Sequence, residues 1–258
     1  MDTDILTSSL RLAADLLDTT RRAWIIGIAN LAGLPDDTPP MDEEKIRTVI
    51  EIASSTAGFP SGPLSYIGSG YDVTGEDHHR LVTLVGGPDA PNLEMQLGLG
   101  IGGFVAAALT RTDIFDDGSE HVGGVPLADV ESVIADTFVL AVGTSLAQSY
   151  TGPVEFGFGI FDDRPGVPLV GYVIDDETGA LTPAPIQEGF GVVKGATMID
   201  ETMTPRSAHL DIHRMAADAL ARFGALPQLT SMLDPSNETY SSNRLLYQDP
   251  RFIEVWNG

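Results

Sequence analysis

The sequence contains no cysteine and only two lysines, Lys45 and Lys194. Without cysteine the chain has no disulfide, no thiolate metal ligand and no thiol nucleophile. Basic residues are scarce as a class, because 14 Lys and Arg stand against 37 Asp and Glu, for a formal net charge of −23. Nucleic acids and anionic lipid surfaces are bound mainly through Lys and Arg. The charge therefore argues against direct phosphate contact with a nucleic acid and against a membrane as partners.

The chain also lacks an unbroken apolar run of membrane length. Its most apolar long stretch, residues 125–146, is interrupted by Asp129, Glu131 and Asp136. The N-terminus, Met1-Asp2-Thr3-Asp4, carries two acidic residues where a signal peptide needs basic ones. We therefore expect a cytoplasmic protein. Its content of 43% hydrophobic and 20% charged residues is that of a globular chain with a sizeable core.

Four helices are predicted from apolar residues at helical spacing. The first pattern begins at Leu6 and continues through Trp24 to Leu31, with Gly33 as its stop. A second helix is expected over residues 42–57, and a last one over 207–223. The longest is expected over 126–148, buried along one face with Ile134 and Phe138 as its central contacts.

Strands are predicted over 81–85, 93–102, 104–112, 154–161, 169–174 and 190–199. The clearest is 93–102, where apolar residues alternate with Glu, Gln and Gly, as in a strand with one buried side. Gly102 and Gly103 then favour a hairpin turn. The phrase Leu97-Gly98-Leu99-Gly100-Ile101 is echoed by Phe156-Gly157-Phe158-Gly159-Ile160. This echo indicates either an internal duplication or close packing against each strand.

The order of elements predicts an α+β fold. We expect a mostly antiparallel sheet from two sheet-then-helix halves, with helices packed on one face and two N-terminal helices. Residues 1–258 are expected to form a single globular unit. Within it, 1–57 is a helical N-terminal segment, 64–149 and 153–224 are the two β-plus-helix halves, and 234–258 is mostly loop.

A glycine-rich segment, Gly98-Leu99-Gly100-Ile101-Gly102-Gly103, matches the dinucleotide-binding pattern. That pattern needs its glycines in a turn between a strand and a helix. Here they fall inside the alternating strand, so we expect no nucleotide at this position and no cofactor elsewhere. Neither a nucleophile elbow nor a phosphate-binding loop is present, and no catalytic residue is indicated.

Two groups of residues have the chemistry of metal ligands, since carboxylate oxygens and imidazole nitrogens bind divalent cations. One group is the loop set Asp113, Asp116, Asp117, Glu120 and His121. The other is His209, Asp211 and His213 at the start of the last helix, where residues four apart share a face. Neither set is complete or correctly spaced, so we expect no metal. The two helix histidines are expected to be partly exposed.

Residues 64–224 resemble, in element order, the accessory C-terminal region of actinobacterial proteins with a Schlafen- or Alba-type DNA-binding domain. The resemblance depends on the strand His79-Arg80-Leu81-Val82, the hairpin through Gly102-Gly103 and the helix end at 216–224. The family's N-terminal domain, with its acidic-aromatic-lysine signature, is missing. The resemblance implies an accessory or interaction module without catalytic residues.

Together these patterns predict a non-catalytic accessory, regulatory or partner-binding protein with an acidic surface. The expected partner is another protein, including a basic one, or a second copy of the chain. The alternative is a divalent-metal-binding protein or a metal-dependent hydrolase that uses the two ligand sets above.

Overall fold

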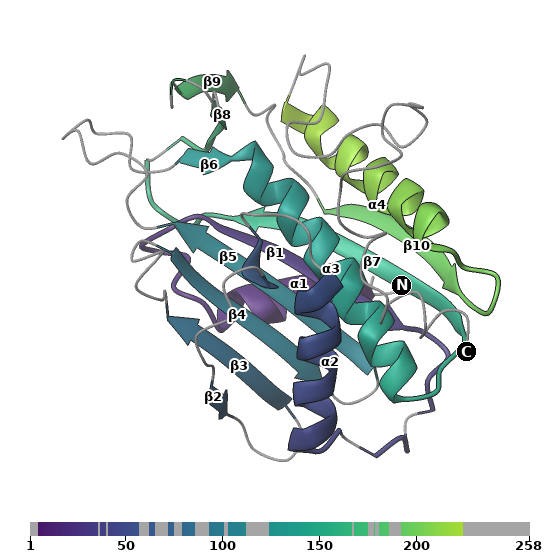
Figure 1. The fold of residues 1–258 in the computed structure, drawn as a ribbon. Coiled ribbons are helices and arrows are strands. Elements are labelled where there is room, and N and C mark those ends of the chain that lie inside the picture. The colour runs from purple at the N-terminus through teal and green to yellow at the C-terminus, as the bar shows by residue number, and fades with distance from the viewer. Residues whose placement is uncertain are drawn as a thin grey trace.

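The fold is that of a computed structural model (Figure 1). It describes residues 5–35, 37–39, 41–56, 62–64, 72–74, 79–85, 93–100, 103–111, 124–166, 168–174, 178, 181–185 and 192–223. The helices are α1 (Ile5–Asp15), α2 (Glu43–Thr56), α3 (Leu127–Ala147), α4 (Pro205–Leu220) and the short 3₁₀ turn η3 (Ala221–Phe223). The strands are β1 (Trp24–Leu31), β2 (Asp72–Thr74), β3 (His79–Val85), β4 (Leu93–Gly100), β5 (Phe104–Arg111), β6 (Gly124–Pro126), β7 (Gly152–Phe161), β8 (Val170–Ile174), β9 (Leu181–Pro185) and β10 (Val193–Ile199).

A seven-stranded antiparallel sheet organises the molecule, in the order β10-β7-β1-β5-β4-β3-β2. A smaller sheet has the order β6-β8-β9, with β6 and β8 parallel. The predicted α+β class with a mostly antiparallel sheet is confirmed. The large sheet draws strands from both predicted halves, and β1 joins them by pairing with β5 on one side and β7 on the other.

The prediction that the first helix continues to Leu31 is wrong. Helix α1 ends at Asp15, and Trp24–Leu31 forms β1, which is buried along its whole length. A strand buried on both faces reads as one continuous apolar run, which periodicity does not distinguish from a buried helix. Alternate β1 residues serve the two faces of the sheet: Ile26 and Ile28 pack with α1, while Ile25 and Ala29 join the core around α3.

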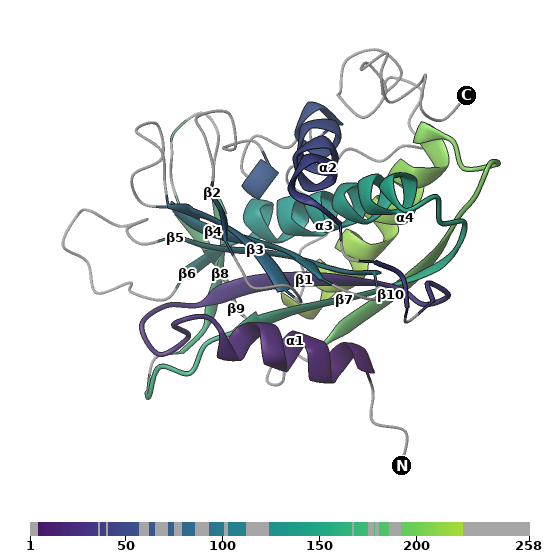
Figure 2. The same cartoon turned by 90° about the horizontal axis from the view of Figure 1, so that it is seen from below.

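The helices lie on both faces of the sheet, so the prediction that they all pack on one face is also wrong. Among the described helices, α1 is the one that covers one face, over β1 and β7. Helices α2, α3 and α4 form the layer on the other face, where α3 contacts both α2 and α4. Figure 2 shows α1 beneath the strands and α2 and α3 above them.

Helix α3 is the centre of the thicker layer. It lies within one residue of the predicted range at each end, between Pro126 at its N-cap and Gln148 at its C-cap. Phe138 and Ile134 are 1% and 0% exposed, and the Phe138 ring stacks on that of Phe156 with centroids 5.3 Å apart, which confirms the predicted contacts. The helix is buried all round and not along one face only. Among the described residues it is also the one helix long and apolar enough to span a membrane, but 89% of that stretch lies inside the protein.

The remaining predicted elements are found with small shifts of their bounds. The two strands predicted around Gly102-Gly103 form the antiparallel pair β4 and β5, and Gly103 adopts a φ of +74°. Helix α4 begins two residues earlier than predicted because Thr204 and Ser207 form a capping box. Strand β9 was not predicted, since its two prolines are unusual in a strand interior.

Candidate functional site

The first predicted ligand set lies outside the described residues. Asp113, Asp116, Asp117, Glu120 and His121 all fall between β5 and β6, in residues 112–123. Their arrangement in space is therefore still a prediction from the sequence.

The second predicted ligand set is placed on α4 but is not brought together as a site. His209 is only 2% exposed and has an interaction partner, whereas His213 is partly exposed. The Asp211 carboxylate accepts hydrogen bonds from the Thr197 hydroxyl and from the Arg214 guanidinium, the latter at 2.9 Å. In the part of the chain that the structure describes, no group of three or more His, Asp or Glu side chains could hold a metal ion.

The expectation that both histidines are partly exposed is thus wrong for His209. The cause is the packing of α4 against both β10 and α3, which buries the side of the helix on which His209 lies. His209 lies beside the buried stripe that includes Ala208 and Ile212. One turn further on, His213 is partly exposed because it lies at the margin of that stripe.

The glycine-rich segment that matches a dinucleotide motif behaves as the alternation predicts. Gly98 and Gly100 lie within β4, which pairs with β3 and β5 on its two sides. In the described part of the chain, the next element after β4 is the strand β5. The turn geometry that a pyrophosphate needs is therefore missing at these two glycines.

The structure buries three carboxyl groups of α3, to which the sequence analysis assigns no role. Asp129, Glu131 and Asp136 are each no more than 1% exposed. Asp129 and Glu131 have interaction partners. One signal in the sequence pointed to them: three acidic residues within the most apolar stretch of the chain.

Asp136 holds part of the connection between α2 and β2 against α3. The backbone N–H of Leu64 donates a 2.8 Å hydrogen bond to Asp136 Oδ2, while Oδ1 is buried without a partner among the described residues. A methyl group on Gly62 would lie 2.3 Å from Oδ2, so the backbone there approaches as closely as glycine permits. Burial raises the pKa of Asp136 from 3.8 to about 8, partly offset by the Leu64 hydrogen bond.

A carboxyl group with this pKa is mostly protonated at neutral pH. It could donate a proton in catalysis only if a substrate reached it, and its side chain is fully enclosed. Its visible contacts are to the backbone of residues 62–64. Asp136 therefore serves as a packing and docking group in this structure.

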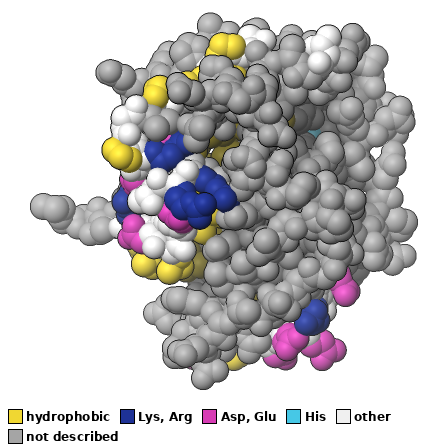
Figure 3. All heavy atoms as spheres, turned by 90° about the vertical axis from the view of Figure 1, so that its left-hand side faces the viewer, with side chains coloured by type: hydrophobic (Ala, Val, Ile, Leu, Met, Phe, Trp, Pro, Cys, Tyr) yellow, Lys and Arg dark blue, Asp and Glu magenta, His cyan; other side chains and the backbone are white. Residues whose placement is uncertain are grey.

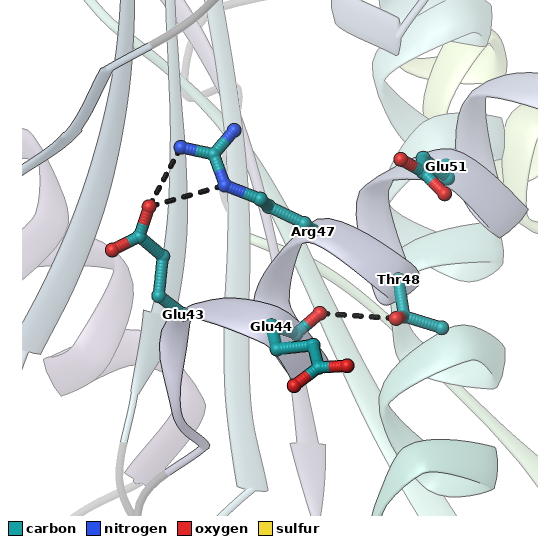
Figure 4. Close-up of a pocket in the computed structure, with 5 residues that line it drawn as sticks. All are labelled: Glu43, Glu44, Arg47, Thr48 and Glu51. Carbon is teal, nitrogen blue, oxygen red and sulfur yellow. Dashed lines mark hydrogen bonds and ion pairs between the residues drawn. The ribbon is translucent and has the colours of Figure 1, made fainter.

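An open hollow of about 540 Å³ lies along the outer side of α2 (Figure 4). Its described lining comes from one helix: Glu43, Glu44, Arg47, Thr48 and Glu51. Arg47 is held by Glu43 at 2.7 Å, and the Thr48 hydroxyl donates to the Glu44 carbonyl. These are exposed pairs one helical turn apart, which stabilise a helix slightly. They assemble neither a nucleophile with a base nor a ligand cage.

A more distinctive surface is the thinly covered side of the sheet. Ile5, Leu12 and Leu16 are 58%, 60% and 65% exposed, and Met198 on β10 is 51% exposed. Ile5, Leu12 and Leu16 are seven and four positions apart, so they lie on one face of α1 and of the turn that follows it. This stripe is separate from the Leu6 and Leu10 side that packs on the sheet.

Met198 lies on the same side of the sheet as α1. In β10, Gly195 and Thr197 face α4, as shown by the closeness of Met215 to Gly195 and by the Thr197–Asp211 hydrogen bond. Alternate residues of a strand point to opposite sides. The exposed residues Lys194, Ala196 and Met198 therefore point toward the α1 side, opposite Gly157, Glu155 and Pro153 of β7. We call these exposed residues the α1 face: Ile5, Leu12, Leu16, Pro153, Glu155, Lys194, Ala196 and Met198.

Charged side chains on the described surface are mixed in sign. On the side of the molecule shown in Figure 3, basic and acidic side chains lie next to one another. At the α1 face, Arg11 lies 3.2 Å from Asp15 and 3.6 Å from Asp163. In the sequence the α1 face corresponds to a second apolar stripe, Ile5, Leu12 and Leu16, but periodicity does not show which of the two stripes is exposed.

No protein-family model matches the chain, and no curated protein or solved structure matches it. The resemblance to the Schlafen- or Alba-associated region therefore stays a prediction.

Proposed function

We propose that the chain is a non-catalytic partner-binding protein, and that the α1 face is its contact surface. The observation that carries this proposal is the exposure of four large apolar side chains on one side of the sheet, three of them in a single helical stripe. Among the described residues a fifth large exposed apolar side chain, Leu210 on α4, lies on the other side of the sheet. Scattered exposed apolar residues are ordinary, whereas a grouped set is typical of an interaction surface.

The energetics of this face suit a reversible contact. Burying the exposed part of each of the four side chains contributes about 1–2 kcal/mol, or roughly 4–8 kcal/mol together. Loss of translational and rotational freedom on association costs about 4–15 kcal/mol. The apolar residues alone therefore support weak binding, and neighbouring polar contacts must supply the rest.

The chemistry of the described side chains supports the proposal that the protein is non-catalytic. Among the described residues, the Asp136 carboxyl, whose pKa is raised by burial, is enclosed and used for packing. The α4 histidines do not converge with a third ligand in the described structure. Turnover of generic ester, phosphate or peptide substrates by the purified protein would contradict the proposal.

Site-specific photo-crosslinking tests the contact surface. A photoreactive amino acid is placed at Leu12, and at Leu210 as a matched control, since both are exposed leucines on helices. We expect an abundant crosslinked protein, identified by mass spectrometry, from position 12 and none from position 210. Equal crosslinking from both positions, or none from position 12, would remove the α1 face as the contact surface.

A further inference from the structure

The identity of the partner follows from the charges around the α1 face, provided that this face is the contact surface proposed above. From residue 5 to residue 22 the chain carries three arginines and two aspartates. On the same side, β10 exposes Lys194 and β7 exposes Glu155, and Asp163 pairs with Arg11. These segments therefore hold four basic and four acidic residues, in a chain whose totals are 14 and 37.

We infer that the occupant of the α1 face is a second copy of this chain, in a two-fold symmetric dimer. A locally neutral apolar surface with both signs of charge is self-complementary, as a two-fold interface requires. Two copies of a −23 chain repel one another least where their contact surfaces are neutral. A strongly basic partner would gain little from this face and would be drawn to the acidic remainder of the surface.

The stripe on α1 has a geometry that fits an antiparallel pairing of two copies. With α1 packed antiparallel on its equivalent, Ile5 of one copy lies beside Leu16 of the other, and the two Leu12 side chains approach the symmetry axis. Arg11 and Asp15 lie one turn apart beside the stripe, so each copy offers both charges to its partner. Every apolar member of the stripe thereby gains an apolar neighbour.

A stable dimer buries more surface than α1 alone can supply. Helix α1 has 11 residues, and a helix of that size is about 16 Å long and about 10 Å wide. That footprint is well below the roughly 800 Å² that each partner buries in a stable dimer. The exposed residues of β7 and β10 that lie beside it, including Met198, must therefore share the interface. The expected dimer is reversible, with a dissociation constant near the micromolar range.

Sedimentation velocity of the purified full chain tests this inference, over a range of protein concentrations and at low, moderate and high sodium chloride. We expect a monomer–dimer equilibrium that strengthens as salt rises, because screening reduces the repulsion between two acidic copies. Leu12→Asp should weaken the dimer at least tenfold, whereas the control Leu210→Asp should leave it unchanged. Circular dichroism confirms that both variants are folded.

A wild-type protein that stays monomeric at all concentrations and salts would overturn the dimer. So would a dimer that Leu12→Asp leaves intact, or one that salt weakens. The photo-crosslinking result separates this failure from failure of the proposed function. A monomer that crosslinks from position 12 to a different protein contradicts only the dimer, whereas a monomer without any crosslink contradicts both.

Discussion

The two sides of the central sheet are covered very differently. On one side, α2, α3 and α4 form a continuous layer, and α3 is enclosed by the sheet and its helical neighbours. On the other side, α1 is the one described helix over the sheet, and β10 keeps Lys194, Ala196 and Met198 exposed. The first side contains even carboxyl groups in its interior, while the second exposes large apolar side chains.

The difference indicates separate roles for the two sides of the sheet. The α3 side stabilises the fold, and the α1 face is available for association. The buried apolar residues on the α3 side pack within the chain, so their truncation should destabilise the fold. Those exposed on the α1 face are available to another molecule, so their loss should change association and leave the fold intact. The predictions below test this division, beginning with a direct comparison of the two sides.

Phe138→Ala should have the largest effect. Phe138 is 1% exposed and stacks on Phe156, and truncation of such a side chain costs about 3–5 kcal/mol. Leu12→Ala, its counterpart on the α1 face, should change the unfolding free energy by less than about 0.5 kcal/mol. Urea denaturation of both variants, at protein concentrations low enough to keep the chain monomeric, measures the two changes in unfolding free energy. Similar losses from both changes would contradict the division.

Asp136→Asn should stabilise the protein at neutral pH by a few kcal/mol. Because the folded-state pKa is raised from 3.8 to about 8, ionisation favours the unfolded chain between these values. Wild-type stability should therefore fall by up to about 1.4 kcal/mol per pH unit as pH rises from about 4 to about 8. The destabilisation caused by Asp136 is absent below about pH 4 and is constant above about pH 8. The asparagine keeps an acceptor for the Leu64 N–H and should lack this slope.

Urea denaturation at several pH values measures both curves. Thr197→Val, which removes a hydroxyl that donates to the Asp211 carboxylate, provides a comparison that leaves Asp136 untouched. Parallel curves for wild type and Asp136→Asn would show that Asp136 is ionised in the folded protein.

Gly157→Val should destabilise the protein by about 1–3 kcal/mol by overpacking the contact between α1 and the sheet. A Cβ at Gly157 would lie 3.1 Å from Leu10 and 3.4 Å from Ile28, and valine adds two further methyl groups. Ala196→Val changes an exposed residue of β10 on the same side of the sheet as Gly157. It should leave the unfolding free energy nearly unchanged. Denaturation midpoints and proteolysis near α1 report the difference. A neutral Gly157→Val would mean that α1 is not packed closely on β7.

Removal of divalent metal should have the smallest effect. A bound ion stabilises the folded state by mass action, so a chelator lowers the melting temperature only where a site exists. We expect an unchanged melt and no stoichiometric metal by elemental analysis. A fall in melting temperature with chelator would revive the metal alternative. Variants of Asp116 or of His213 would then show whether the loop set or the α4 set holds the ion.

The sequence predicts elements whose signal is local, and fails where the signal depends on neighbours in space. Helix α3 and the β4–β5 hairpin were found because periodicity and turn residues act within the segment. Strand β1 was misread because its burial comes from α1 on one face and α3 on the other. The close approach of residues 62–64 to Asp136 joins positions 72 apart in the chain, which no local pattern records.

The glycines of β7 illustrate the same limit. Their alternation indicates either a duplication or close packing, and the sequence alone does not decide between them. In the structure Gly157 lies against Leu6 and Leu10 of α1, so packing accounts for that glycine without a duplication. The exposed stripe of α1 was visible in the sequence, but its exposure depends on the position of the helix on the sheet.

Hydroxyl-radical footprinting across a dilution series tests the central claim most directly, because it reads the solvent exposure of individual side chains. Leu12, Leu16 and Met198 are more than half exposed in the single chain, as Leu210 nearly is. On going from dilute to concentrated protein, the account predicts that oxidation of Leu12, Leu16 and Met198 falls together, while oxidation of Leu210 stays constant. Unchanged oxidation of the three residues, or equal protection of Leu210, would contradict the claim that the α1 face is where copies of this chain meet.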